Sequence, residues 1–259
     1  MTHTDTERPL LMITNDDGVD APGIRVLAEV ALRHADVVVV APDGGNSGKS
    51  HAFTVMDELR VRRCAGFGRA TCYAVKGTPV DCAKLGFYGL MPRRPAAILS
   101  GINHGSNTSI SVHYSGTLGA AREAALMGVP GIGFSFANCD ESADMTEAAR
   151  VADAVLDAFF QGRLPKSNFL SVNIPRGTVR GLRMARMSMG RWIEKPIHYR
   201  SPMGHEMYWL DGSFEDYDKA RNDTDEAAIA QGWASITPFM IDVTDYDVLN
   251  ENIDFHINL

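Results

Sequence analysis

The stretch LLMITNDDG, residues Leu10–Gly18, places two adjacent carboxylates directly after a short apolar run. The run Leu10–Thr14 is short, apolar up to Ile13 and followed by polar residues, which is typical of a fully buried strand. Asp16 and Asp17 would repel each other there unless a cation neutralised them. This predicts a buried strand with a divalent-metal site at its end. The simpler interpretation is that both are turn residues, one of them capping the next helix.

Buried strands and amphipathic helices alternate along the rest of the chain. The run Asp36–Pro42 (DVVVVAP) contains four consecutive β-branched valines, as in a parallel sheet that is covered on both faces. Alternation of this kind predicts an α/β fold, with a Rossmann-like, mostly parallel sheet flanked by helices. We expect further strands at 59–63, 71–75, 96–100, 131–136 and 169–174, and helices starting near 21 and over 78–91, 118–127 and 144–160.

The character of the sequence changes near Gly190, where tryptophan, tyrosine, proline and charge mix without a helical period. The segment MYWLDGSF (207–214) fits a hairpin arm. A length of 259 residues is enough for one large domain. We therefore predict a single domain over 1–259, with a core over about 1–190 and a C-terminal extension over about 190–259.

Charge and hydropathy exclude some partners. A net charge of -7 argues against binding to duplex nucleic acid, which needs clustered Lys and Arg. No apolar run approaches the ~20 residues of a membrane-spanning helix. The polar start MTHTDTERP does not resemble a secretory signal. We expect a cytoplasmic protein without a membrane partner.

Oxygen-rich segments follow several of the predicted strands. In open parallel sheets, ligands bind outside the carboxyl ends of the strands. Residues 15–18, 46–48, 101–105 and 114–117 would meet there. Their Asp, Ser and Asn oxygens are hard ligands, which suit Mg²⁺ or Mn²⁺ better than zinc. The pattern predicts one divalent ion at this edge.

Ser115, Gly116 and Thr117 precede an alanine-rich helical run. A helix N-terminus and two hydroxyls favour a phosphate, although Ser115 taken alone is more typical of a simple N-cap. Other candidates for acid–base or supporting roles are ordinary surface or hydrogen-bonding residues in the alternative interpretation; they are Lys49, His51, His104, His113 and Arg122.

Taken together and in order, the motifs resemble those of the SurE family of survival-protein nucleotidases, over about residues 10–238. The matching segments are NDDG (15–18), APGI (21–24), VAPD (40–43) before SG (47–48), GTP (77–79), DC (81–82), SGIN (100–103) before Gly105, YSGT (114–117), VNIP (172–175), TD (224–225) and ITP (236–238). The chain departs from the family at 44–46, where GGN replaces residues that are often basic. Positive charge near the phosphate is expected to be lower.

The resemblance implies a divalent-metal-dependent phosphatase of nucleoside 5′- and 3′-monophosphates, with some members also trimming short polyphosphate. It also implies homodimers or homotetramers that exchange C-terminal segments. The implied metal ligands are Asp16, Asp17, Ser47 and Asn103. The implied phosphate-side residues are Asn15, Ser115, Gly116 and Thr117.

The resulting hypothesis is direct hydrolysis of a phosphomonoester without a covalent intermediate, with Asp16 and Asp17 as the catalytic carboxylates. A signalling receiver domain would need an Asp at the end of strand 96–100, where the sequence instead has SGIN. A dehalogenase-type phosphatase would need D-x-D rather than adjacent aspartates. A metal-dependent nucleotide sensor without turnover stays open as an alternative.

Overall fold

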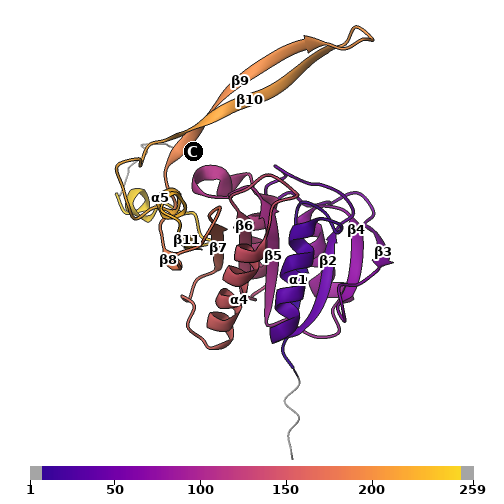
Figure 1. The fold of residues 1–259 in the computed structure, drawn as a ribbon. Helices are drawn as coiled ribbons and strands as arrows, with labels where there is room; N and C mark the ends of the chain where they lie inside the picture. The colour runs from indigo at the N-terminus through magenta and orange to yellow at the C-terminus, as the bar shows by residue number, and fades with distance from the viewer. Residues whose placement is uncertain (1–7, 252–259) are drawn as a thin grey trace, which may run out of the picture.

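The computed structural model describes residues 8–251, and a nine-stranded sheet forms the centre of this part of the chain (Figure 1). The order of the strands is β3-β4-β2-β1-β5-β6-β7-β11-β8. Their bounds are β1 Leu10–Thr14, β2 Asp36–Pro42, β3 Arg60–Cys64, β4 Thr71–Lys76, β5 Ala97–His104, β6 Gly131–Phe136, β7 Phe169–Ile174, β8 Leu182–Met184 and β11 Ala234–Phe239. Six strands from β4 to β7 run parallel. At the edges of this set β3 pairs antiparallel with β4 and β11 pairs antiparallel with β7, while β8 pairs parallel with β11. The predicted α/β fold class is confirmed.

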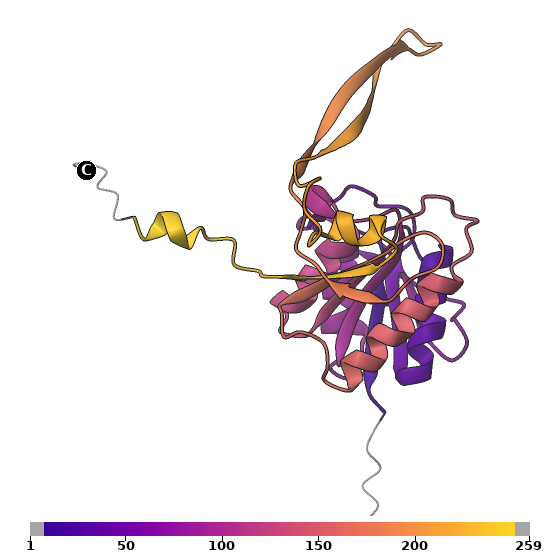
Figure 2. The same ribbon diagram turned by 60° about the vertical axis from the view of Figure 1, so that its left-hand side comes forward.

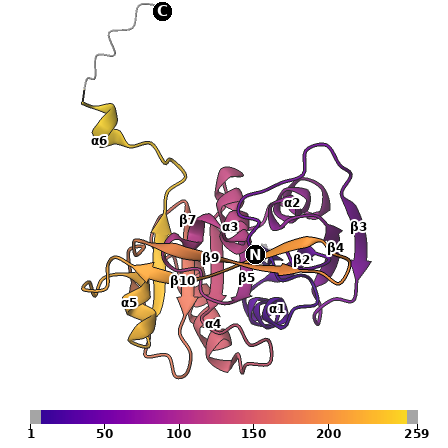
Figure 3. The same cartoon turned by 90° about the horizontal axis from the view of Figure 1, so that it is seen from above.

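Helices cover both faces of the sheet, as the view from above shows (Figure 3). Two of them, α1 (Pro22–His34) and α4 (Thr146–Phe160), pack together on one face. On the other face α2 (Pro79–Leu85) packs against α3 (Gly116–Leu126). Strand β1 serves both layers, because its side chains alternate between the faces. Leu11 and Ile13 join one apolar cluster, and Leu10 and Met12 join the other.

Several element bounds differ from the predictions, among them those of α2, β5 and α3. Helix α2 ends at Leu85, and one π-helical turn, η1 (Gly86–Leu90), completes the expected helix 78–91. Strand β5 continues to His104, beyond the expected end at Ser100, and its pairing with β6 shifts register on the way. Helix α3 begins two residues earlier than expected, with Ser115 as its N-cap. The β5 extension brings Asn103 to the edge of the sheet.

A long hairpin rises above the carboxyl edge of the sheet (Figures 1 and 3). Its strands are β9 (Gly190–Arg200) and β10 (Glu206–Asp216), which pair antiparallel along their full length. Nearly all its residues are exposed. The character of the chain therefore changes at Gly190 as expected, and the arm is a hairpin.

The chain then returns to the core. Helix α5 (Asp225–Ala230) leads into β11, which pairs with β7 and β8 inside the sheet. Only part of the segment 190–259 thus leaves the core. Beyond β11 the chain leads away to the exposed helix α6 (Tyr246–Leu249), as Figure 2 shows. Within residues 8–251, no helix is both long enough and apolar enough to cross a membrane.

Candidate functional site

The oxygen-rich segments meet where the order of the strands reverses. Strand β1 is flanked by β2 on one side and by β5 on the other. Connections that leave in opposite directions open a crevice at the carboxyl ends of such strands. Asp16 and Asp17 follow β1, Ser47 follows β2, and Asn103 lies near the end of β5. The fold therefore brings the predicted ligand segments to one edge.

Asp16 is buried, with 3% of its surface exposed. Its Oδ1 accepts a hydrogen bond from the hydroxyl of Thr117, and its backbone carbonyl accepts one from the amide of Asn46 at 2.6 Å. Burial raises the pKa of Asp16 from 3.8 to about 6, against the lowering effect of the Thr117 bond, and the charge of Asp17 adds to the rise. No lysine, arginine or histidine within residues 8–251 forms an ion pair with it. Asp16 is a buried carboxylate that lacks a protein cation.

Asp17 lies beside His104. The backbone amide of His104 donates to Asp17 Oδ2 at 3.3 Å, and the His104 Nδ1 atom lies 3.6 Å from the same oxygen. The Asp17 side chain is 20% exposed, so it lies nearer the solvent than Asp16 does. The His104 side chain is buried, and its Nε2 atom has no hydrogen-bond partner among the described residues. Of the candidate supporting residues, His104 is the one that contacts the carboxylate pair.

Asn103 and Ser47 line cavities next to the carboxylates. The amide nitrogen of Asn103 donates to the carbonyl of Gly105 at 2.9 Å, which leaves its side-chain oxygen as the atom able to act as a ligand. Ser47 is exposed and lines two cavities, one together with Asn103 and the other together with Asp17. His104 lines both of them as well. Ser47 thus lies between Asn103 and Asp17, two of the other predicted metal ligands.

Asn15 is fully buried at the end of β1. Its amide nitrogen donates to the carbonyl of Gly18 at 2.8 Å and so closes the turn that carries the two aspartates. Its side-chain oxygen is buried without a partner within residues 8–251. A buried acceptor of this kind marks a site that is incomplete without a further group.

The residues at the start of α3, 115–117, have different roles. The Oγ atom of Ser115 accepts a hydrogen bond from the amide of Leu118 at 3.1 Å, so this residue does cap α3. Its hydroxyl proton stays available to a ligand, and Ser115 lines the cavity that also contains Ser47 and Asn103. The hydroxyl of Thr117 is directed instead at Asp16. The structure therefore supports a positioning role for Thr117, and phosphate binding by this residue stays a prediction.

Gly116 allows α3 to approach the first aspartate closely. A Cβ atom built on Gly116 would lie 2.9 Å from Asp16 Cβ and 3.2 Å from Asp16 Oδ2. We expect Gly116→Ala to destabilise the fold by about 1–3 kcal/mol, because Asp16 or the helix must shift, and to lower activity with it. Urea unfolding and phosphate release measure the two effects.

Gly89→Ala is the matched control for this substitution. The nearest atom to its added methyl group is Leu85 Cδ1 at 3.6 Å, an ordinary contact. Stability and activity of Gly116→Ala equal to those of Gly89→Ala would show that the close approach is unimportant.

Two buried carboxylates fasten the loop that carries Ser47. Asp81 accepts hydrogen bonds from the amide and the hydroxyl of Thr54, both at 2.7 Å. Glu123 pairs with His51 at 2.8 Å and with Lys84 at 2.7 Å, and these partners keep its pKa low although burial raises it. His51 therefore has a structural role, and the loop is held by α2 and α3 on one face of the sheet.

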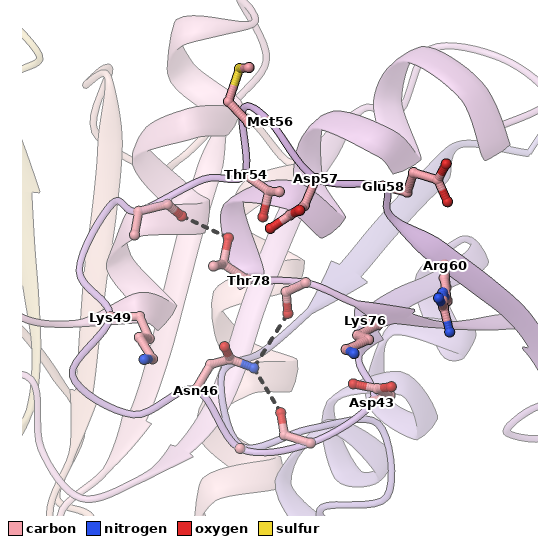
Figure 4. Close-up of a pocket in the computed structure, with 14 residues that line it drawn as sticks. Asp43, Asn46, Lys49, Thr54, Met56, Asp57, Glu58, Arg60, Lys76 and Thr78 are labelled. Carbon is pink, nitrogen blue, oxygen red and sulfur yellow. Dashed lines mark hydrogen bonds between the residues drawn. The ribbon is translucent and has the colours of Figure 1, made fainter.

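The remaining candidates lie away from the carboxylate pair. Arg122 is placed over the ring of Phe169, 5.5 Å from its centroid. The backbone carbonyl of His113 accepts the hydroxyl of Ser50 at 2.5 Å. Lys49 lines a neighbouring cavity of about 950 Å³ (Figure 4). The structure does not bring these three side chains to Asp16 or Asp17.

The wall of that larger cavity carries charges of both signs (Figure 4). None of the four predicted metal ligands and no aromatic residue is among the described residues that line it. It borders the loop that carries Ser47 without including Ser47 itself, and the side-chain amide of Asn46 is hydrogen bonded to the carbonyls of Gly44 and Gly77. Its charged lining residues are Asp43, Lys49, Asp57, Glu58, Arg60 and Lys76.

Sequence reasoning missed two residues at the site. Trp192 and Glu194, at the base of the hairpin, line the cavity that contains Ser47, Asn103 and Ser115. No motif surrounds them in the sequence. The only available signal was the unusual tryptophan directly after the change of character at Gly190.

The donor set fits a hard divalent cation. Within residues 8–251 there is no group of three or more His, Cys, Asp or Glu side chains that could hold a metal, so a zinc-type cluster is not present there. The site offers two carboxylates with amide and hydroxyl oxygens around them, and these are ligands for Mg²⁺ or Mn²⁺. The buried charge of Asp16 and the unpartnered oxygen of Asn15 are the observations that call for such an ion.

Comparisons with known proteins agree with the resemblance seen in the sequence. Residues 11–194 match the family model described as "Survival protein SurE". Proteins named 5'-nucleotidase SurE include one from Cytophaga hutchinsonii, 40% identical over 94% of this chain and 95% of its own, and one from Phocaeicola vulgatus, 37% identical over 95% and 96%. The crystal structure of the Sure protein from Aquifex aeolicus superposes with a TM-score of 0.78 at 33% identity, covering 93% of this chain and 97% of its own. The fold, the site and these matches together show that the chain belongs to the SurE family.

Proposed function

We propose that this chain is a divalent-metal-dependent nucleotidase. It hydrolyses nucleoside 5′-monophosphates to nucleoside and phosphate, and its activity extends to 3′-monophosphates and short polyphosphate. The name of the relatives, 5'-nucleotidase, supports the substrate class. The observation that carries the proposal is the buried carboxylate of Asp16, beside Asp17 and without a protein cation, at the ligand-binding edge of the sheet.

One Mg²⁺ or Mn²⁺ per subunit would be held by four side chains. These are Asp16, Asp17, Ser47 and Asn103, from three neighbouring strand ends. When bound, the ion supplies Lewis-acid polarisation of a phosphate oxygen and of water. Thr117 keeps the Asp16 carboxylate oriented through its hydroxyl, and Asn15 fixes the turn. The chain thus presents a pre-ordered set of oxygen donors.

The phosphate would lie against the start of α3. Ser115 can donate its hydroxyl proton, because its oxygen already accepts from the amide of Leu118. The first amides of a helix carry a partial positive charge, which stabilises the equatorial oxygens of a phosphate in the transition state. Water attacks phosphorus directly in this proposal, and no side chain forms a phosphoenzyme.

Phosphate release from 5′- and 3′-nucleoside monophosphates tests the proposal. We expect release with Mg²⁺ or Mn²⁺, almost none in EDTA, and recovery when an excess of the metal is added back. Release that is unaffected by thorough chelation would contradict the metal dependence. A folded protein that binds nucleotide but releases no phosphate with any metal would instead be a nucleotide sensor.

We also propose that the chain works as a homodimer or homotetramer that exchanges C-terminal segments. Large apolar side chains stay exposed along the hairpin, among them Ile197, Tyr199, Trp209 and Leu210. Exposed apolar surface of this extent is typical of an interaction site. Light scattering of the full chain measures the assembly.

A further inference from the structure

The cavity at the base of the hairpin has a different character from the rest of the site. It measures about 390 Å³, within the usual range for small-molecule sites. One wall contains Ser47, Asn103 and Ser115, the residues assigned above to metal and phosphate. A group attached to a phosphate held there can extend along this cavity.

Two aromatic side chains stand on the wall of this cavity. Trp192 comes from β9 and is 45% exposed, and Tyr114 directly precedes the helix cap Ser115 and is 56% exposed. Trp192 is held by its cross-strand partner Phe214, with the two ring centroids 5.6 Å apart. The indole is therefore supported by packing while nearly half of its surface stays open.

Glu194 adds a polar requirement to the same wall. An ionised carboxylate only accepts hydrogen bonds, so it suits the hydroxyls of a ribose or an exocyclic amino group and disfavours a second anionic group. Ser106, Asn107 and Ser111 make the remaining lining polar. A flat aromatic ring attached to a sugar matches these groups better than an aliphatic or a highly charged chain does.

We propose that Trp192, together with Tyr114, forms a stacking platform for the nucleobase of the substrate. The proposal rests on the proposed nucleotidase function, and it assigns substrate selectivity to the hairpin. Aromatic side chains bind bases through their π-faces with little dependence on sequence, because every base has such a face. The platform therefore discriminates between nucleotides and other phosphomonoesters more strongly than it discriminates between the bases.

Steady-state kinetics of Trp192→Ala with two substrate types tests the platform. The full-length protein with Mn²⁺ is given the nucleoside 5′-monophosphates and, separately, ribose 5-phosphate, which keeps the sugar and the phosphate but lacks the base. We expect KM for the nucleotides to rise roughly tenfold with kcat little changed, because base–aromatic stacking contributes to binding. We expect kcat/KM for ribose 5-phosphate to stay within about twofold of wild type, and Trp192→Phe to retain most of the nucleotide selectivity.

Trp209→Ala is the matched control, since it removes the same side chain from the distal part of the same hairpin, where it pairs with Ile197. It should leave the ratio of nucleotide to ribose 5-phosphate activity unchanged. An unchanged nucleotide KM in Trp192→Ala would overturn the platform. So would an equal loss on both substrates, which would show a role in folding or assembly.

The stacking platform can be tested even if the nucleotidase proposal fails. If the wild type releases phosphate from neither substrate, calorimetry with a nucleoside monophosphate and with ribose 5-phosphate decides the matter. Weaker nucleotide binding in Trp192→Ala, with ribose 5-phosphate unaffected, supports the platform even in a protein without turnover. Equal binding of the nucleotide by both proteins overturns it.

Discussion

Replacing Asp17 with asparagine lowers kcat/KM for nucleoside monophosphates by at least about a hundredfold and leaves the fold intact. Asp17 contributes half of the formal charge of the carboxylate pair, and an amide is a much weaker ligand for a hard cation. Its structural role is small, because among the described residues its side chain accepts one hydrogen bond, the long 3.3 Å bond from the His104 backbone amide to Oδ2, and the His104 ring lies nearby. Phosphate release over a range of Mn²⁺ concentrations and thermal unfolding in EDTA measure the two effects.

A second carboxylate at the same sheet edge provides the control. Asp43 follows β2, is exposed and lines the neighbouring cavity of mixed charge. Asp43→Asn loses the same charge without touching the ligand set, so its kcat/KM stays within about threefold of wild type by the usual size of surface effects. Full activity in Asp17→Asn would exclude Asp17 as a ligand.

What could be predicted from the sequence was mainly local. The run Leu10–Thr14 is apolar up to Ile13, so a buried strand followed from composition, and the parallel sheet followed from the alternation of such runs with helices. The pair Asp16 and Asp17 then had to lie at the ligand-binding edge, because the end of a parallel strand fixes where the next residues lie. The strand Leu10–Thr14 alone was therefore enough to predict the position of the two carboxylates.

The unpredicted features depend on contacts between distant segments. The hydroxyl of Thr117 meets Asp16, 101 residues earlier in the chain, and nothing near Thr117 in the sequence indicates that partner. The extension of β5 through Gly101 contains glycine and polar residues that read as a loop, yet β6 provides the pairing that makes it a strand. The position of Trp192 depends on where the hairpin leaves the sheet, and a local pattern contains no such information.

These contacts also explain how the site can be rigid without an ion. The turn of Asn15, the cap of α3 and the two anchors of the Ser47 loop all consist of hydrogen bonds or ion pairs within the chain. The buried carboxylate of Asp16 has no ion-pair partner among the described residues. The buried Asp16 carboxylate therefore lowers the stability of the metal-free fold, while the surrounding contacts keep the geometry of the binding site.

Asp16→Asn makes the metal-free protein more stable at pH 7.5 while abolishing metal-dependent activity. The folded-state pKa of Asp16 is about 6 and the reference value is 3.8. Between these values the folded state binds more protons than the unfolded state, so the free energy of unfolding falls as the pH rises and stays level above about 6. The shift corresponds to about 3 kcal/mol at pH 7.5, and asparagine removes it. Urea unfolding in EDTA at several pH values measures the difference between the two proteins.

The pH dependence and the response to metal separate this explanation from a general effect of the substitution. Well below pH 3.8 Asp16 is protonated in both the folded and the unfolded state, so the stability advantage of Asp16→Asn is expected to vanish there. Saturating Mn²⁺ stabilises the wild type, by about 2.7 kcal/mol at a hundred times its dissociation constant, and does not stabilise the variant. Asp144→Asn is the control, because the pKa of this exposed carboxyl is lowered by hydrogen bonds with Thr146, and its removal brings no gain at any pH. If Asp16→Asn were less stable than the wild type in EDTA at pH 7.5, the Asp16 carboxylate would stabilise the metal-free fold. That result would contradict the interpretation that its buried charge costs stability until a cation binds.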